Sequence, residues 1–414
     1  MGRGLSYLGS FLLSVAVVFA GGFQLNDHSA RSVGMAFSTV ALQRDATTLY
    51  YNPAGMAQLG AGIHLSGGSA VILPGAKFTG ITSLNQAETY ELQSETFVVP
   101  HFFAVWNPQD LPLSAGIAVY APFGLGTTWD ANWIGRHLAI KTALQMIAVQ
   151  PLLGYTFALP TGKLSIAAGP YYAISSVELQ RKIPTFTPEP LVKLTGDGTG
   201  IGFGGGVVYE HGQGLKVGLA YRHPVEIQYD GTVTYENVAG LEALFQESDG
   251  GTTLRFPADF RLGIAYQATD QLWVEVGANY VGWSSYDTLK IEIAKAPGDP
   301  GQSTTLVNPR NYKDVVAFRF GAEYQISPRM QLRFGITYDP MPVDPVYVEP
   351  TLPEVDRFDL SIGWGYQLSP WLHLDLGYMG IIGPQTDVVD SPVGFDGIYN
   401  AWANIFVATF NVSL

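Results

Sequence analysis

Three groups of residues in this sequence could in principle carry chemistry. GIGFGG, at 200–205, has the letters of a dinucleotide-binding loop, but the chain continues as VVYEH, which alternates like a strand, whereas such a loop leads into a helix. The histidines, at positions 28, 64, 101, 137, 211, 223 and 373, show no HExxH spacing. No serine lies in a GxSxG elbow, and the chain contains no cysteine. We therefore predict neither catalysis nor a metal site or cofactor.

Composition narrows the class of protein further. The chain has 414 residues, of which 47% are hydrophobic and 14% charged, and its formal net charge is -13. Nucleic-acid binding needs clustered lysine and arginine, and no such cluster is present, so we expect no nucleic-acid partner.

The first twenty residues are predicted to be a cleaved signal peptide. MGRGLSYLGSFLLSVAVVFA has an early cation at Arg3, an apolar run over 11–19 and a small-x-small end at Ala20, which puts the mature start at Gly21. The alternative is an uncleaved membrane helix, but the run is shorter than the ~20 apolar residues that a span requires. No later stretch approaches that length without a charge, so a mature protein in a membrane must cross it with strands.

Most of the remaining chain alternates between apolar and polar residues. In FRFGAEYQISPRMQLRFGITYD, at 318–339, one set of alternate residues is apolar and the other contains Arg319, Glu323, Gln325, Arg333 and Asp339. This pattern recurs in fourteen segments: 61–73, 94–106, 112–123, 144–158, 163–177, 200–210, 214–228, 254–267, 271–284, 314–326, 330–339, 357–368, 371–381 and 402–414. The connections alternate between short turns such as SPR and long segments at 74–93, 124–143, 178–199, 229–253, 285–313, 340–356 and 382–401.

An even strand number, with short turns at one end and long loops at the other, is typical of an outer-membrane barrel. We predict an all-β fold over 59–414: a monomeric, transmembrane antiparallel β-barrel of fourteen strands with a charged lumen and an apolar outer face. A soluble β-sandwich is the alternative, but it would not need long loops at one end only.

Residues 21–58 do not alternate. They are rich in small and polar residues, with helix-compatible patches near 29–43. The segment is too long for a tail and too short for a domain, so we predict a hatch folded inside the lumen.

Several motifs resemble the FadL-type outer-membrane transporters of long-chain fatty acids, whose relatives carry toluene and similar compounds. They are GGFQL at 21–25, Ser-Ala and Gly-Met-Ala after it, Asn52-Pro53-Ala54, PFGLGTTWDANWIGR, RFPADFRLGIAYQ, WVEVGANYVGWSSYDTL, FRFGAEYQIS, LRFGITYD and LPEVDRFDLSIGWGYQLS. The resemblance spans nearly the whole chain. It implies a fourteen-stranded barrel with an N-terminal hatch, passive uptake of a hydrophobic ligand, and exit through a gap in the barrel wall.

The resemblance also implies roles for particular residues. The ligand-gated role falls on Phe23, with Leu25 beside it, and the hatch motif falls on Asn52, Pro53 and Ala54. Each has a simpler interpretation. Phe23 could be only an apolar anchor for the terminus, and NPAG could be only the bend between hatch and first strand, because proline pushes the preceding residue away from helical angles.

The loops and the third strand supply the remaining candidate residues. VAGLEALF, in 229–253, would place Leu241, Leu244 and Phe245 on one helical face, with Phe186 of the loop 178–199 as a partner wall. The resemblance places a first, weaker ligand site between two such loops, although these residues could simply pack together. For the wall gap we expect Gly116, since ladders break at bulges, glycine or proline; it could instead be a small residue at a crowded contact.

The leading function is therefore passive outer-membrane transport of hydrophobic molecules, most simply long-chain fatty acids, by loop capture, hatch-gated binding and lateral release. An uptake channel for toluene-type hydrocarbons is the alternative. An outer-membrane lipase-like enzyme or an open porin fits less well. A fatty-acid carboxylate needs a cation, and Arg261, Arg319 and Arg333 are available. Outer-membrane lipid and lipopolysaccharide would surround the protein.

Overall fold

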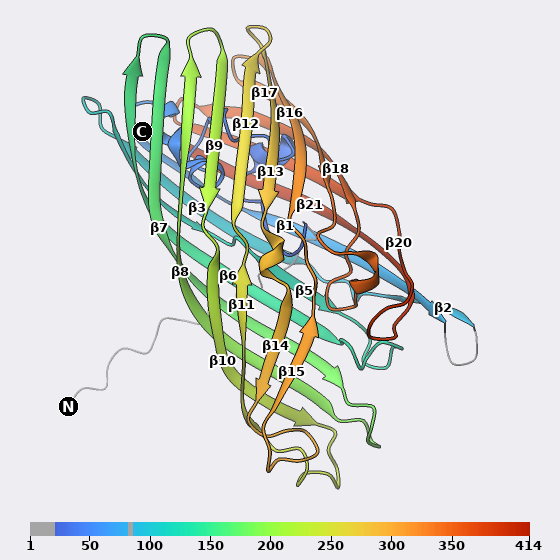
Figure 1. Cartoon of the computed structure of the whole chain (residues 1–414). Helices are drawn as coiled ribbons and strands as arrows, with labels where there is room; N and C mark the ends of the chain where they lie inside the picture. Colours follow the sequence, from blue (N-terminus) through green and yellow to red (C-terminus); the bar gives the residue numbers. More distant parts are fainter. Residues whose placement is uncertain (1–20, 82–85) are drawn as a thin grey trace, which may run out of the picture.

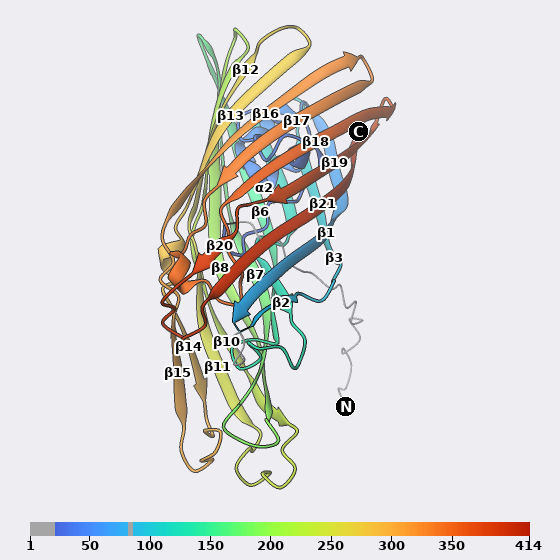
Figure 2. The same ribbon diagram turned by 90° about the vertical axis from the view of Figure 1, so that its right-hand side faces the viewer.

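The computed structural model describes residues 21–81 and 86–414, so the predicted signal peptide at 1–20 lies outside the described residues. The described chain is an all-β antiparallel barrel of fourteen strands, as predicted (Figures 1 and 2). It closes where β1 (Gly62–Ile81) pairs with both β3 (Phe97–Asn107) and β21 (Gly397–Ser413).

Seven of the barrel strands are single segments and seven are made of two consecutive segments. The single ones are β1, β6 (Lys141–Leu159), β7 (Gly162–Lys182), β8 (Leu191–His211), β17 (Met330–Asp339), β18 (Arg357–Ser369) and β21. The divided ones are β2 (Ala87–Glu91) with β3, β4 (Leu113–Tyr120) with β5 (Gly124–Thr128), β9 (Leu215–Arg222) with β10 (Val225–Glu236), β11 (Ser248–Phe256) with β12 (Asp259–Gln267), β13 (Leu272–Val281) with β14 (Thr288–Ile293), β15 (Thr304–Pro309) with β16 (Val315–Ser327), and β19 (Leu372–Ile382) with β20 (Thr386–Val388).

The strands extend further toward the long-loop end than the sequence indicated. The segments β2, β11, β14 and β15 reach into regions that we expected to be loops, and β8 begins at Leu191 rather than near 200. In β14 the alternation runs with the apolar side inward: Leu289, Ile291 and Ile293 are buried, whereas Lys290 and Glu292 are exposed. In Figure 1, β11, β14 and β15 project as long hairpins at the bottom of the barrel, and β2 projects to the right.

Alternate residues face opposite sides of the wall, as expected for a membrane barrel. In β16 and β17, the side chains of Phe318, Phe334 and Tyr338 are exposed on the outside, whereas Arg319 and Arg333 are buried in the lumen. The same alternation holds in β12, where Phe260 is exposed and Arg261 buried.

The N-terminal segment lies inside the barrel, in the half nearer the short turns (Figure 2). It contains the short helices α1 (Ala30–Gly34) and α2 (Thr48–Tyr51) and the 3-10 helix η1 (Pro53–Gln58); two further 3-10 turns, η2 (Trp283–Ser285) and η3 (Pro345–Tyr347), lie in the wall and a loop. Every residue from 21 to 56 except Arg44 is buried. Within the described ranges, no helix is long and apolar enough to span a membrane.

The wall is interrupted between β3 and β5, at a different place from the one we expected. β4 pairs with β3 only over 115–119, and β5 pairs with β6 but not with β3. Gly116 itself is paired on both sides, with Val105 and Leu152, so the prediction of a break there is wrong. A side chain at Gly116 would meet Leu49 and Met56 of the hatch, so glycine is needed for close packing. The chain leaves the wall at 121–123 instead.

Candidate functional site

The mature N-terminus is hydrogen-bonded to the interrupted part of the wall. Leu25 N–H donates to the Pro122 carbonyl at 2.9 Å, and Gly124 N–H donates to the Phe23 carbonyl at 3.0 Å. Gln24 and Phe123 form the antiparallel bridge between them. Proline has no N–H, so Pro122 cannot take part as a donor in a wall ladder, but its carbonyl can still accept from the terminus. We refer to residues 21–25 as the strap and to 121–123 as the kink.

Phe23 lies inside an aromatic cluster rather than in solvent. Its ring is 2% exposed and meets four rings edge-on, with centroid distances of 6.0 Å to Phe123, 5.9 Å to Phe256, 4.8 Å to Trp283 and 5.3 Å to Tyr286. These rings come from the kink, β11 and η2. The strap therefore packs between the kink and the opposite wall.

The first residues of the strap approach a charged group. Gly21 N–H donates to Asp339 at 3.2 Å, and Arg357 pairs with the same carboxylate at 2.7 Å. Gly22 has a φ of +69°, and any side chain there would overlap the Trp283 ring. Burial raises the pKa of the neighbouring Glu354 carboxyl to about 8. Glycine at both positions lets the strap run closely past these groups.

The rest of the hatch is bound to the wall through charged and amide groups. Glu275 of β13 accepts hydrogen bonds from three successive backbone amides, those of Val40 at 2.6 Å, Ala41 at 3.0 Å and Leu42 at 2.9 Å. Arg31 pairs with Glu323 of β16 at 2.8 Å. Sequence reasoning missed these bonds because nothing near either partner in the chain signals the other.

Asn52 explains the position of the NPA motif in the hatch. Its side-chain oxygen accepts from Ala54 N–H at 3.2 Å and so caps η1, which begins at Pro53. Its amide nitrogen donates to the carbonyls of Val40, at 2.9 Å, and of Val207 in β8, at 3.1 Å. The motif is thus a bend, as one interpretation held, and Asn52 also ties the hatch to the wall.

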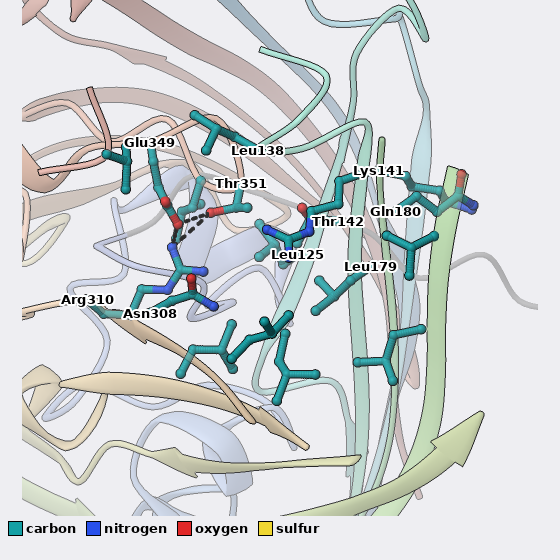
Figure 3. Close-up of a pocket in the computed structure, with 18 of the residues that line it drawn as sticks. Leu125, Leu138, Lys141, Thr142, Leu179, Gln180, Asn308, Arg310, Glu349 and Thr351 are labelled. Carbon is teal, nitrogen blue, oxygen red and sulfur yellow. Dashed lines mark hydrogen bonds and ion pairs between the residues drawn. The ribbon is translucent and has the colours of Figure 1, made fainter. Parts of the chain in front are cut away.

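A cavity of about 240 Å³ lies in the part of the barrel nearer the long loops (Figure 3). Most of its lining is aliphatic: Leu125, Leu138, Leu179, Leu194, Leu289, Ile291 and Leu306. Three cations border it, namely Lys141, Arg181 and Arg310. Figure 3 shows Arg310 directed toward Glu349, and Lys141 is bound to Glu178 at 2.9 Å.

Arg181 differs from the other two cations of this cavity. Among the described residues, no carboxylate lies within 4 Å of its guanidinium. The arginines that we considered from the sequence lie elsewhere, near the hatch: Arg261 is bound to Asp259, and Arg333 to Glu323 and Asp375. The cation available in the cavity could not have been singled out from sequence, because its lack of a partner is a property of the fold.

Comparison with known proteins identifies the family. The family model described as outer membrane protein transport protein (OMPP1/FadL/TodX) matches residues 11–414. The chain belongs to this FadL family. It is 26% identical over 432 residues to a long-chain fatty acid transport protein of Escherichia coli, covering 95% of this chain and 94% of that one. The crystal structure of a FadL homologue of Pseudomonas aeruginosa superposes with a TM-score of 0.81 at 20% identity, covering 95% of this chain and 99% of the other. A toluene transporter of Ralstonia pickettii superposes with a TM-score of 0.70 at 17% identity, covering 95% and 99%.

Family membership settles the general function. The protein is an outer-membrane channel for hydrophobic compounds and not an enzyme, as the sequence led us to expect. The relatives include both fatty acid and toluene transporters by name, so membership alone does not fix the substrate of this FadL-family chain.

The candidate loop residues come together, although not on a helix. The segment around Leu241 and Leu244 forms two successive turns, with Leu241 N–H donating to the Val238 carbonyl at 2.6 Å, so the expected helical face is absent. The rings of Phe186 and Phe245 nevertheless meet edge-on at 4.9 Å. The two loops therefore pack against each other, which was the simpler of our two interpretations.

Proposed function

We propose that this FadL-family protein carries long-chain fatty acids passively from the cell surface into the outer membrane and releases them sideways through the wall. The observation that supports this most is the pairing of the strap with the kink. One short segment, Phe23–Leu25, both contributes Phe23 to the aromatic cluster, whose Tyr286 also lines the cavity, and supplies hydrogen bonds to the interrupted wall. A ligand that displaces the strap would therefore free the kink as well.

The proposed route begins at the loops. Phe186, Leu241 and Leu244 are partly exposed at the long-loop end, where Phe186 packs on the buried Phe245, and they offer an apolar surface for first capture. The ligand then fills the cavity, displaces Phe23 and leaves beside the kink, with Asn52, Pro53 and Ala54 keeping the remaining hatch in place.

The fatty-acid assignment rests on Arg181. Arg181 is half-buried in a mostly apolar lining and has no carboxylate partner within 4 Å among the described residues, so a carboxylate ligand would pair with it where water only partly screens the charge. The rest of the lining suits an alkyl chain. An aromatic hydrocarbon remains the second candidate, supported by the ring cluster around Phe23, which a small flat ligand could enter.

Lateral release follows from the solubility of the ligand. Each CH₂ group gains roughly 0.8 kcal/mol by staying out of water. A long acyl chain released into the periplasm would lose that gain, whereas one released into the bilayer would keep it. The wall is interrupted at the kink, between β3 and β5, so release beside the kink offers the more favourable path.

The absence of cysteine from the chain allows a direct test. Gln24→Cys combined with Phe123→Cys places two thiols at bridged positions, and oxidation would fix the strap to the kink. We expect uptake of oleate to fall sharply on oxidation and to recover on reduction. The control is Ile336→Cys with Leu360→Cys, a paired position in the continuous wall between β17 and β18. If the oxidised protein, with the strap disulfide verified by mass spectrometry, takes up oleate as fast as the dithiol form does, this route is excluded.

The mature terminus is part of the same proposal. We infer that the signal is cleaved before Gly21, so that the new ammonium lies at the Asp339 carboxylate that the Gly21 nitrogen already contacts at 3.2 Å. N-terminal sequencing of protein purified from outer membranes tests the cleavage site. A first residue other than Gly21 would contradict it.

A further inference from the structure

A group of buried polar side chains beside the kink is not explained by the fold. His28 follows the strap and is 0% exposed, yet neither ring nitrogen has a hydrogen-bond partner among the described residues. His101 of β3 is 4% exposed, and its Nδ1 also lacks a partner, while its Nε2 reaches Thr409 Oγ at 3.1 Å. Buried polar groups are almost always hydrogen-bonded, so each exception needs a reason.

These histidines lie on the two sides of the wall interruption. His101 is the last residue of the β3 stretch that has no partner on the β5 side, since pairing with β4 begins at Phe102. The backbone of Ala121, in the kink, lies close to the His28 ring, although no hydrogen bond of normal geometry joins them. Tyr120 connects the two, with its ring 5.8 Å from His28 and 6.5 Å from Phe103, which neighbours His101 at 6.0 Å.

An excess of positive charge lies next to His28. The centroids of the Tyr50 and His28 rings are 4.3 Å apart. The guanidinium carbons of Arg222 and Arg261 lie over the Tyr50 ring, at 4.4 Å and 4.6 Å from its centroid. Among the described residues, Asp259 is the one carboxylate within 4 Å of either. The Arg222 Nη1 has no hydrogen-bond partner. Two buried cations thus share one buried anion.

We propose that His28, His101 and Arg222 form a second polar site on the transport path, which holds the carboxyl group of the ligand while its alkyl chain leaves through the wall. This inference rests on the proposed function and adds a defined site to it. A carboxylate accepts several hydrogen bonds and would supply the anion that the two arginines lack.

The position of the site fits the order of events. Leu125 lines the cavity, Phe123 contacts the strap, and Ala121 lies close to His28, so the kink leads from the cavity to the site. An acyl chain can partition into lipid without help, but its head group cannot, because an unpaired charge in an apolar medium is strongly disfavoured. A polar site at the opening lowers that barrier for acids and does nothing for hydrocarbons.

The test compares an acid with a neutral hydrocarbon of equal length. We expect His28→Phe combined with His101→Phe to lower oleate uptake about tenfold, since hydrogen bonds to a charged group are worth at least that factor, and to leave octadecene uptake unchanged. His28→Gln combined with His101→Gln, which keeps donors and acceptors, should restore most oleate uptake. The matched control is His64→Phe, because both nitrogens of His64 already have partners, Ser413 at 3.0 Å and Gly60 at 3.2 Å. The uptake rate of each variant is divided by the amount of folded barrel, which is measured from its band on gels of unboiled samples.

The outcomes separate this site from the route. An equal fall for oleate and octadecene would mean that the histidines only shape the opening, and no fall would mean that the head group does not use them; either result overturns the site. If the strap disulfide blocks oleate while the histidine variants do not, the lateral route stands and the site falls. If the disulfide does not block oleate, the route and this site with it are overturned.

Discussion

The strap and the body of the hatch, residues 29–58, are held in the barrel by different kinds of contact. The strap is held by two backbone hydrogen bonds to the kink, by one contact of Gly21 with Asp339 and by the packing of the Phe23 ring. In addition, the Gln24 amide donates to Asp259 at 2.8 Å and the Tyr50 hydroxyl donates to the Leu25 carbonyl. The body is held by buried charge. Glu275 binds three of its amides, and Glu323 pairs with Arg31.

This difference indicates which part moves. Breaking the contacts of the body would leave several buried charges and amides without partners, each at a cost of about 1–3 kcal/mol or more. Backbone hydrogen bonds of the strap contribute only about 1 kcal/mol each net, and Asp259 keeps Arg222 and Arg261 as partners when Gln24 leaves it. The burial of a few methylene groups of a ligand offsets this loss. We therefore expect gating to involve the strap alone, with the body remaining in place.

Removing the anchor of the body gives the largest expected effect. Glu275→Ala leaves the amides of Val40, Ala41 and Leu42 buried without an acceptor, at about 1–3 kcal/mol for each. We expect the body to loosen, the unfolding midpoint to fall and single-channel conductance to rise from near zero. Glu292→Ala, at an exposed position of β14, is the control. A closed, fully stable Glu275→Ala channel would mean that these bonds do not hold the body.

A smaller disturbance of the body tests Asn52. A methyl group at Gly206 of β8 would overlap the Asn52 side-chain oxygen, so Gly206→Ala must displace the residue that joins the hatch to β8. Overpacking of this kind typically costs about 1–3 kcal/mol, and we expect partial leakage measured as conductance. Gly67→Ala is the matched control, because a methyl group there meets nothing nearer than Phe102 at 3.7 Å. Equal conductance for both variants would show that the contact of Asn52 with β8 does not help to keep the hatch in place.

The architecture could be predicted from the sequence because a strand alternates with period 2 and lipid faces every membrane segment. The strand number, the faces of β12, β16 and β17, and the buried N-terminal segment all follow from that pattern. The kink could have been found as well, since Pro122 lacks the N–H that a ladder requires; we chose Gly116 because glycine also breaks strands. The contacts that hold the body of the hatch could not be predicted from the sequence. Glu275 and Val40 are 235 positions apart, and nothing local to either indicates the other.

The strap should respond without disturbing the barrel. Phe23→Ala removes a ring that touches four others, and comparable truncations cost about 3–5 kcal/mol. That cost falls on strap closure alone, so we expect faster hydrogen exchange at residues 21–28 with no change in the unfolding midpoint. Phe410→Ala, on the lipid-facing side of β21, is the control. A lowered midpoint in Phe23→Ala would mean that the strap is part of the stable body, which would remove the distinction drawn above.

The smallest effect concerns pH at the start of the strap. Burial raises the pKa of Glu354 to about 8, above its usual value, so the closed strap favours the protonated carboxyl. A raised pKa means that the closed form binds more protons than the open form. Strap closure is therefore strongest at low pH and weakens as the pH rises from the usual glutamate range toward about 8.

We expect strap exchange, corrected for the intrinsic rate of amide exchange, to be about threefold to tenfold faster at pH 9 than at pH 6. The effect stays modest because opening removes only the part of the burial that the strap supplies, and it also removes the Gly22 amide, which lowers the pKa of Glu354. Glu354→Gln keeps the shape and cannot ionise, so its exchange should be slow at both values. Asp344→Asn, at a half-exposed position of the same loop that pairs with Lys313, should retain the wild-type dependence. If Glu354→Gln keeps the pH dependence, another group controls the strap. If the wild-type dependence runs in the opposite direction, closure requires the charged carboxylate, and the mature ammonium at Gly21 becomes the group that binds it.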